Sequence, residues 1–149
     1  MSEASEALAN RTMMEALYIV AVSRRLENPA DAVIDPVRRE DLLPRYGKEY
    51  LALMRERVAG AGAREYEDED GGQAVDSFDA AETMIACNEE CADMVFYLVQ
   101  TIQKVGADDL VLRTALYEGM RHLVEAMIPL GIACDLLEVT IADGPPPVG

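Results

Sequence analysis

Three carboxylates, Glu89, Glu90 and Asp93, stand directly before or inside the apolar run of NEECADMVFYLV, residues 88–99. At the period of an α-helix, Glu90 and Asp93 are one turn apart on the same face. Like charges at this spacing repel each other by about 0.2–0.5 kcal/mol. A bound cation cancels that repulsion, and free access of water screens it. The stretch therefore predicts either a divalent-cation site or the wet face of an amphipathic helix.

The helix expected around these carboxylates, near 77–105, separates its side chains by type. At about 100° per residue, apolar side chains cover most of its circumference and leave one polar sector about 100° wide. Tyr97 lies in that sector together with five acids, which we call the acidic face: Asp79, Glu82, Glu89, Glu90 and Asp93. Carboxylate oxygens are the ligands that Mg²⁺ and Mn²⁺ prefer. We therefore expect the acidic face to bind Mg²⁺ or Mn²⁺.

The net charge of −15 is unevenly distributed along the chain. Residues 1–64 contain ten acids and ten bases, whereas residues 65–149 contain eighteen acids and three bases. Between Arg64 and Lys104 there are eleven acids and no Lys or Arg. Such a surface repels nucleic-acid backbone and anionic lipid, and it attracts metal cations or a basic protein partner. We expect no direct nucleic-acid binding.

The 149 residues, half of them hydrophobic, predict one globular helical domain over 1–143 and a Pro/Gly-rich tail over 144–149. The acidic start MSEASEALAN lacks the features of a signal peptide. The longest wholly apolar run near it, residues 16–22, is too short to cross a bilayer. We expect a cytoplasmic protein without membrane contact.

Hydrophobic periodicity and the positions of proline and glycine predict an all-α bundle of four to five helices. The long helix near 77–105, capped by Asp76 or Ser77, is expected at its centre. The other expected segments are a helix over 5–27, an extended connector over 29–44 with room for one short turn, a helix over 45–59, a loop over 64–72, a helix over 110–128 capped by Asp108, and a broken fifth helix over 130–141. So wide an apolar surface on the central helix also predicts a homo-oligomer.

The three cysteines, Cys87, Cys91 and Cys134, have apolar neighbours. Cys87 and Cys91 are four residues apart, so they share one helical face. A soft-metal site lacks a clear fourth ligand and a nearby histidine. We expect free, buried thiols in a reducing compartment.

The segment EECADMVFYL resembles the second metal-binding motif of the MazG-like superfamily of all-α nucleoside triphosphate pyrophosphohydrolases. The motif, Glu-x-x-Asp before an apolar stretch, matches Glu90 and Asp93. The following VGADDLVLRTALYEGMR resembles the turn and next helix of those proteins, so that the likeness covers roughly 82–121. Members also carry an earlier Glu-x-x-Glu on a separate helix. Its nearest match, Asp79-Ala80-Ala81-Glu82, falls on the same predicted helix, so the site is either assembled differently here or the likeness is limited to one short motif.

The resemblance implies an activity and roles for named residues. Glu90 and Asp93 would be catalytic, and the acidic face would hold Mg²⁺ ions that bridge a nucleoside triphosphate. Attack by an oriented water between the α- and β-phosphates would release pyrophosphate and a monophosphate. The substrate's charge would need cationic contacts, and the late candidates are Lys104, Arg113 and Arg121.

A non-catalytic protein is the competing interpretation. An acidic helical bundle suits an adaptor, an inhibitor of a basic protein, or a mimic of nucleic-acid charge. No glycine-rich phosphate loop is present, and the single histidine, His122, has no Ser or Cys in a recognisable nucleophile context. A catalytic site is expected to gather acids from two helices in one pocket, whereas a charge mimic is expected to spread them along an open surface.

Overall fold

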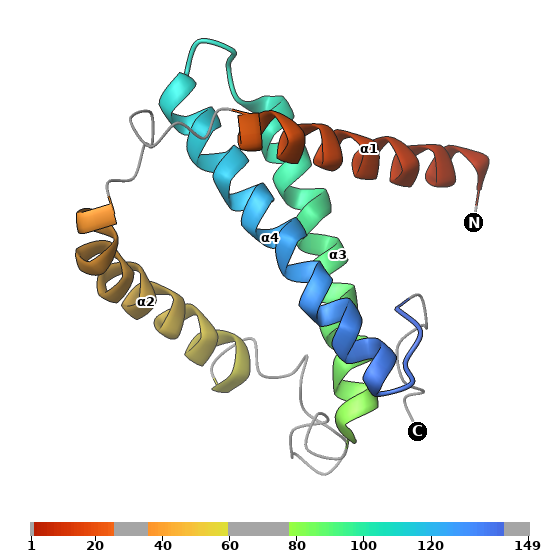
Figure 1. Cartoon of the computed structure of the whole chain (residues 1–149). Helices are drawn as coiled ribbons and strands as arrows, with labels where there is room; N and C mark the ends of the chain where they lie inside the picture. Colours follow the sequence, from red (N-terminus) through yellow and green to blue (C-terminus); the bar gives the residue numbers. More distant parts are fainter. Residues whose placement is uncertain (1, 26–35, 60–77, 142–149) are drawn as a thin grey trace. The chain divides into compact units, whose positions relative to one another are not determined.

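The computed structural model describes residues 2–25, 36–59 and 78–141, and these ranges contain helices and no strand. The helices are α1 (Glu3–Arg25), α2 (Pro36–Ala59), α3 (Ala80–Lys104) and α4 (Leu110–Leu136), shown in Figure 1. The chain divides into two compact units. One unit, Met1–Val33 with Ala80–Gly149, carries α1, α3 and α4, and the other, Ile34–Asp79, carries α2. The predicted all-α class is confirmed, and a single domain over 1–143 stays a prediction.

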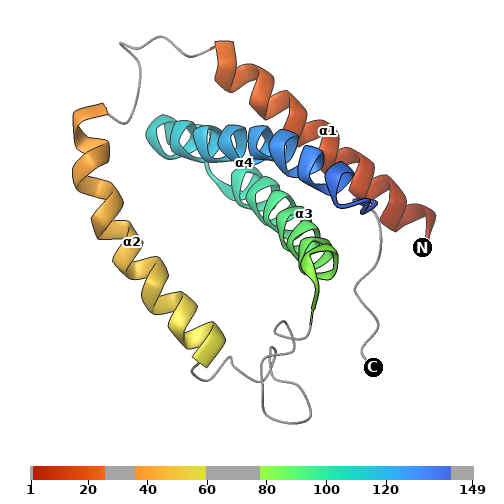
Figure 2. The same cartoon turned by 60° about the horizontal axis from the view of Figure 1, so that its bottom comes forward.

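In the first unit, α3 and α4 form an antiparallel pair joined by the turn at 105–109, and α1 packs against both (Figures 1 and 2). Asp109 caps α4, because its carboxylate accepts a hydrogen bond of 3.1 Å from the backbone N–H of Leu112. The predicted cap, Asp108, is therefore wrong by one residue. The Arg113 guanidinium closes the same turn by donating to the carbonyl of Val105 at 3.5 Å.

The core of this unit lies where α1, α3 and α4 meet. Its side chains are Ala16, Ile19 and Val20 of α1, Val95, Val99 and Ile102 of α3, and Met120 of α4. The small Ala16 side chain, fully buried, lets the α1 backbone approach its neighbours closely. An ion pair of 2.8 Å between Arg24 and Glu125 links α1 to α4 at the surface.

The central helix α3 begins at Ala80, close to the predicted start at 77. The predicted caps, Asp76 and Ser77, lie outside the described residues. Fewer side chains of α3 are buried than its sequence predicts. Its buried residues are Val95, Val99 and Ile102. Met94 and Phe96 are 51% and 36% exposed. Only part of the apolar surface predicted for α3 is therefore buried within the described structure.

The helix α2 begins at Pro36, so the extended connector expected over 29–44 is wrong for residues 36–44. A proline in the first turn of a helix lacks only an N–H that has no partner there. The residues that follow, RREDLL, are mostly strong helix formers. Pro44 lies inside the helix and its missing N–H costs one backbone hydrogen bond. Residues 29–35 and the expected loop over 64–72 lie outside the described residues.

The helix α4 continues through Pro129 to Leu136, so the predicted end at 128 and the separate fifth helix are both wrong. A proline inside a helix costs about 3 kcal/mol. Burial of the segment beyond it offsets that cost, since Cys134 is fully buried and Val139 is 8% exposed. The Cys134 thiol also exchanges hydrogen bonds with the Asn88 side chain of α3.

The end of α4 is a Schellman motif without glycine. The N–H of Val139 donates to the carbonyl of Cys134 at 2.9 Å, and the N–H of Glu138 donates to that of Asp135 at 3.1 Å. Glu138 takes the left-handed position with φ of 55°. This conformation is costly for a residue with a Cβ atom and natural for glycine.

Replacing Glu138 with Gly should therefore raise the free energy of unfolding by about 0.5–1 kcal/mol, because glycine removes the left-handed strain. Chemical denaturation of the two proteins measures the change. Glu138→Ala is the matched control, since it removes the same charge but keeps the Cβ atom. An equal gain in both variants would assign the effect to charge instead of backbone strain.

The packing of the core leads to a second prediction about stability. Met120 is fully buried, so Met120→Ala should lower the free energy of unfolding by about 2–5 kcal/mol through lost burial and the cavity left behind. Met14 is 70% exposed on α1, and Met14→Ala should change stability by at most about 0.5 kcal/mol. Similar losses in both variants would show that the helices do not pack as described.

Candidate functional site

The acidic face is solvent-accessible along α3. Glu89, Glu90 and Asp93 are exposed, and Tyr97 in the same sector is 67% exposed. Asp79 directly precedes α3 and is exposed, whereas Glu82 in its first turn is half-buried. Of the predicted polar sector, all residues except the half-buried Glu82 are therefore exposed. Lys104, at the other end of α3, is the first basic residue on the helix.

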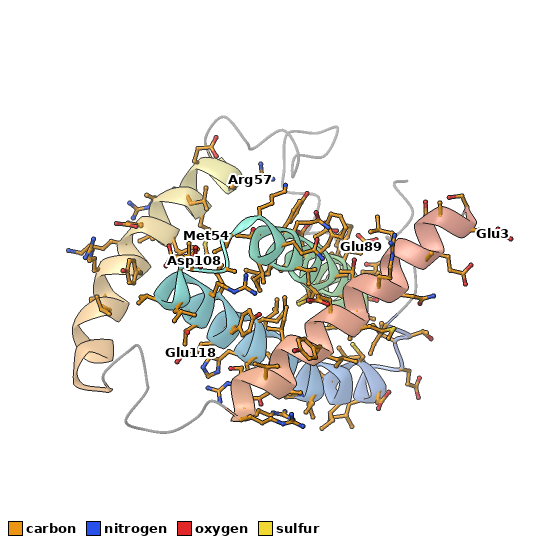
Figure 3. All side chains as sticks on the ribbon, turned by 90° about the horizontal axis from the view of Figure 1, so that it is seen from above. Glu3, Met54, Arg57, Glu89, Asp108 and Glu118 are labelled. Carbon is orange, nitrogen blue, oxygen red and sulfur yellow. The ribbon has the colours of Figure 1, made fainter. Side chains whose placement is uncertain are left out.

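Within the described residues, no three His, Cys, Asp or Glu side chains are arranged so as to hold a metal ion. Glu90 and Asp93 remain a pair of oxygen donors one turn apart. Figure 3 shows Glu89 on α3 and Glu118 on α4 at separate places, and Glu118 is half-buried. Glu89, Glu90 and Asp93 thus follow one face of α3, and the described carboxylates form no cluster of three that could hold an ion between two helices.

The three residues predicted to contact the substrate's charge, Lys104, Arg113 and Arg121, lie in different environments. Lys104 is exposed at the end of α3, eleven residues from Asp93, which is about 16 Å along a helix. Arg113 donates to the Tyr117 hydroxyl at 3.0 Å and to Val105, so it is engaged at the interhelical turn. Arg121 is buried, with 8% of its surface exposed. The structure therefore does not bring Lys104 and Arg113 to the Glu90–Asp93 turn.

A cavity of about 480 Å³ lies between α1, α3 and α4, next to the core. Its described lining contains no charged side chain, and its polar members are Thr12, Asn88 and Cys91. The sequence does not predict this cavity, because its walls come from three helices. One signal was available, since the small residues Ala9, Ala92 and Gly131 of its lining occur on otherwise apolar helix faces.

All three cysteines are free thiols, as predicted. Cys134 is fully buried, whereas Cys87 and Cys91 are half-buried. Burial raises the pKa of the Cys91 thiol above its ordinary value, and the neighbouring Cys87 and Glu90 raise it further. Cys91 is therefore protonated at neutral pH and is a weak nucleophile. Nothing in this arrangement favours covalent catalysis through Cys91.

Cys91 should consequently react slowly with iodoacetamide at pH 7.5, compared with the same residue in the urea-unfolded chain. Cys87→Ala removes a neighbour that raises the pKa, so it should speed the alkylation of Cys91, measured by peptide mass spectrometry. Because folding favours the protonated thiol, this contribution to stability is present at neutral pH and is lost as the pH rises through the raised pKa. Alkylation of Cys91 at the unfolded rate would contradict this description.

Comparison with known proteins yields no match to a family model, to a curated protein or to a solved structure. Among residues 2–25, 36–59 and 78–141, no helix has the length and apolarity needed to cross a membrane.

Proposed function

We propose that this chain is a non-catalytic acidic interaction protein and that Glu89, Glu90 and Asp93 on α3 contact a basic protein partner. One observation carries the proposal: these carboxylates are exposed along a single open helix face. The described lining of the cavity in the same unit is uncharged, so these carboxylates do not line it. An exposed row of one charge sign steers a partner of opposite charge and sets its orientation.

A defined lysine-rich peptide tests this proposal by isothermal titration calorimetry at several salt concentrations. Neutralising the three residues (Glu89→Gln, Glu90→Gln, Asp93→Asn) should weaken binding by about 3- to 160-fold at low salt, given about 0.2–1 kcal/mol for each exposed ion pair. The difference should vanish near 1 M salt, where charges are screened within about 3 Å.

A control variant keeps the change in net charge but moves it elsewhere: Glu49→Gln, Glu56→Gln and Asp135→Asn, all at exposed positions. It should bind the peptide nearly as well as the wild type. Equal weakening in both variants would mean that net charge, and not the face of α3, determines binding.

The second candidate function is that of a metal-dependent nucleoside triphosphate pyrophosphohydrolase. The observation that favours it is the exposed pair Glu90 and Asp93, one turn apart on a helix without a basic residue before Lys104. Mg²⁺ commonly takes one or two protein carboxylates and completes its shell with water and substrate phosphates. The pair therefore fits the ion, with Glu89, Glu82 and Asp79 as further oxygen donors on the chain. Bound Mg²⁺ would neutralise the charge of the triphosphate.

If Glu90 and Asp93 bind Mg²⁺ or Mn²⁺, millimolar ion should raise the melting temperature, because it binds only the folded arrangement. Asp93→Asn should abolish that gain and keep the helix content. In metal-free buffer the same change should be neutral or mildly stabilising, since it relieves repulsion between neighbouring carboxylates. Pyrophosphate release across a nucleotide panel, with and without Mg²⁺, tests the activity itself. No metal-dependent shift in melting temperature would remove the support for this second function.

Self-association and a cytoplasmic location complete the proposal. Large apolar side chains are exposed on every described helix, among them Tyr18 on α1, Tyr50 on α2, Met94 on α3 and Ile128 on α4. Such surface favours a homo-oligomer. Three free cysteines suit a reducing compartment such as the cytosol.

A further inference from the structure

The cavity between α1, α3 and α4 has the size of a small-molecule site. Its volume of about 480 Å³ lies within the ordinary range of about 300–1,000 Å³ for ligand pockets. Met13 of α1 and Phe96 of α3, both in the lining, are 42% and 36% exposed, so these walls of the cavity reach solvent. Val95 and Met127 belong to both the cavity lining and the core region. The cavity is therefore an extension of the packed interior.

The described interior of the cavity offers a ligand mainly apolar contacts, with few polar groups and no charge. The Thr12 hydroxyl donates to the backbone carbonyl of Leu8 at 2.8 Å. The Asn88 amide donates to the Cys134 thiol at 3.4 Å. These two polar groups are already engaged within the protein, and the described lining has no charge. A ligand inside the cavity is therefore held by burial of apolar surface.

The α3 side of the cavity rim carries two carboxylates, as the helical positions of its residues indicate. By helical arithmetic at about 100° per residue, Glu89 lies about 20° and Asp93 about 60° beyond the lining residue Phe96 on α3. Both carboxylates are exposed. A negative rim on a chain with a net charge of −15 attracts a cationic group and repels an anionic one. Anionic amphiphiles such as carboxylates with an alkyl chain are thus disfavoured.

We infer that this cavity binds an amphipathic organic cation, with the apolar body between the three helices and the cationic group beside Glu89 and Asp93. The interior of this small-molecule site is distinct from the protein–protein contact proposed above, whereas Glu89 and Asp93 take part in both. Substitutions in the cavity walls leave the three carboxylates of α3 unchanged, so the two proposals are tested independently.

Three probes with the same ten-carbon chain test the inference: decyltrimethylammonium and decanoate, each below its micellar concentration, and decanol below its solubility limit. Displacement of the neutral fluorophore N-phenyl-1-naphthylamine from the full chain reports occupation of the cavity. The expected order of affinity is decyltrimethylammonium, then decanol, then decanoate. Glu89→Gln with Asp93→Asn should weaken the cation alone, by about two- to fivefold at low salt, and leave decanol unchanged.

Gly131 in the α4 wall offers a way to fill the cavity. A Cβ atom built there meets only Ile141 Cδ1, at an ordinary contact distance of 3.8 Å, so Gly131→Leu should be accommodated and should weaken all three probes at least about tenfold. Gly119→Leu on the same helix is the matched control, since a Cβ there meets nothing within 4 Å and Gly119 is not in the lining. Ala92→Phe fills the cavity from α3. If Gly131→Leu loses helix content, this second variant tests whether filling the cavity weakens binding.

Loss of binding in both filled variants, with the control unchanged and the cation preferred, supports the inference. Unchanged binding in the filled variants overturns the cavity as the site. Decanoate binding as tightly as decyltrimethylammonium overturns the assigned ligand class. Failure of every probe to bind the wild type overturns the inference as a whole.

Discussion

The first unit depends on a small shared core between α1, α3 and α4. Ala16 and Ile19 of α1, Val99 of α3 and Met120 of α4 are fully buried there. Burial of Ile19, Val99 and Met120 supplies about 1.5–3 kcal/mol for each side chain. The core is small, because few side chains are buried in it while large apolar side chains of all three helices are exposed. The flanks of each helix are consequently left to solvent, to the cavity or to another molecule.

Helical geometry assigns a different environment to each side of α3. Val95, Val99 and Ile102 face the core, and Ala92 and Phe96 on the same side face the cavity. The exposed carboxylates occupy the adjoining sector. Repulsion between them costs only tenths of a kcal/mol at an exposed surface, so the core can tolerate the acidic face without a bound ion. Both proposed binding sites thus follow from one amphipathic helix.

Sequence periodicity predicted the elements better than their ends. The helix near 77–105 was correct because apolar and acidic residues separate cleanly around its axis. Pro44 and Pro129 misled the prediction, since both lie inside helices whose neighbouring residues favour or bury the helical continuation. The end of α4 carries no glycine signal, because Glu138 occupies the left-handed position. The acidic face was predictable from one segment, but the cavity was not, since it requires the packing of three segments distant in sequence.

The central claim is that the exposed carboxylates of α3 are the contact surface of this protein. Amide chemical-shift mapping by NMR, with a lysine-rich peptide titrated into the full chain, tests the claim residue by residue. Our account predicts that the largest shifts fall at Glu89, Glu90, Asp93 and Tyr97, and that they disappear at high salt. Shifts of equal size over all acidic residues of the chain, or none on α3, would contradict it.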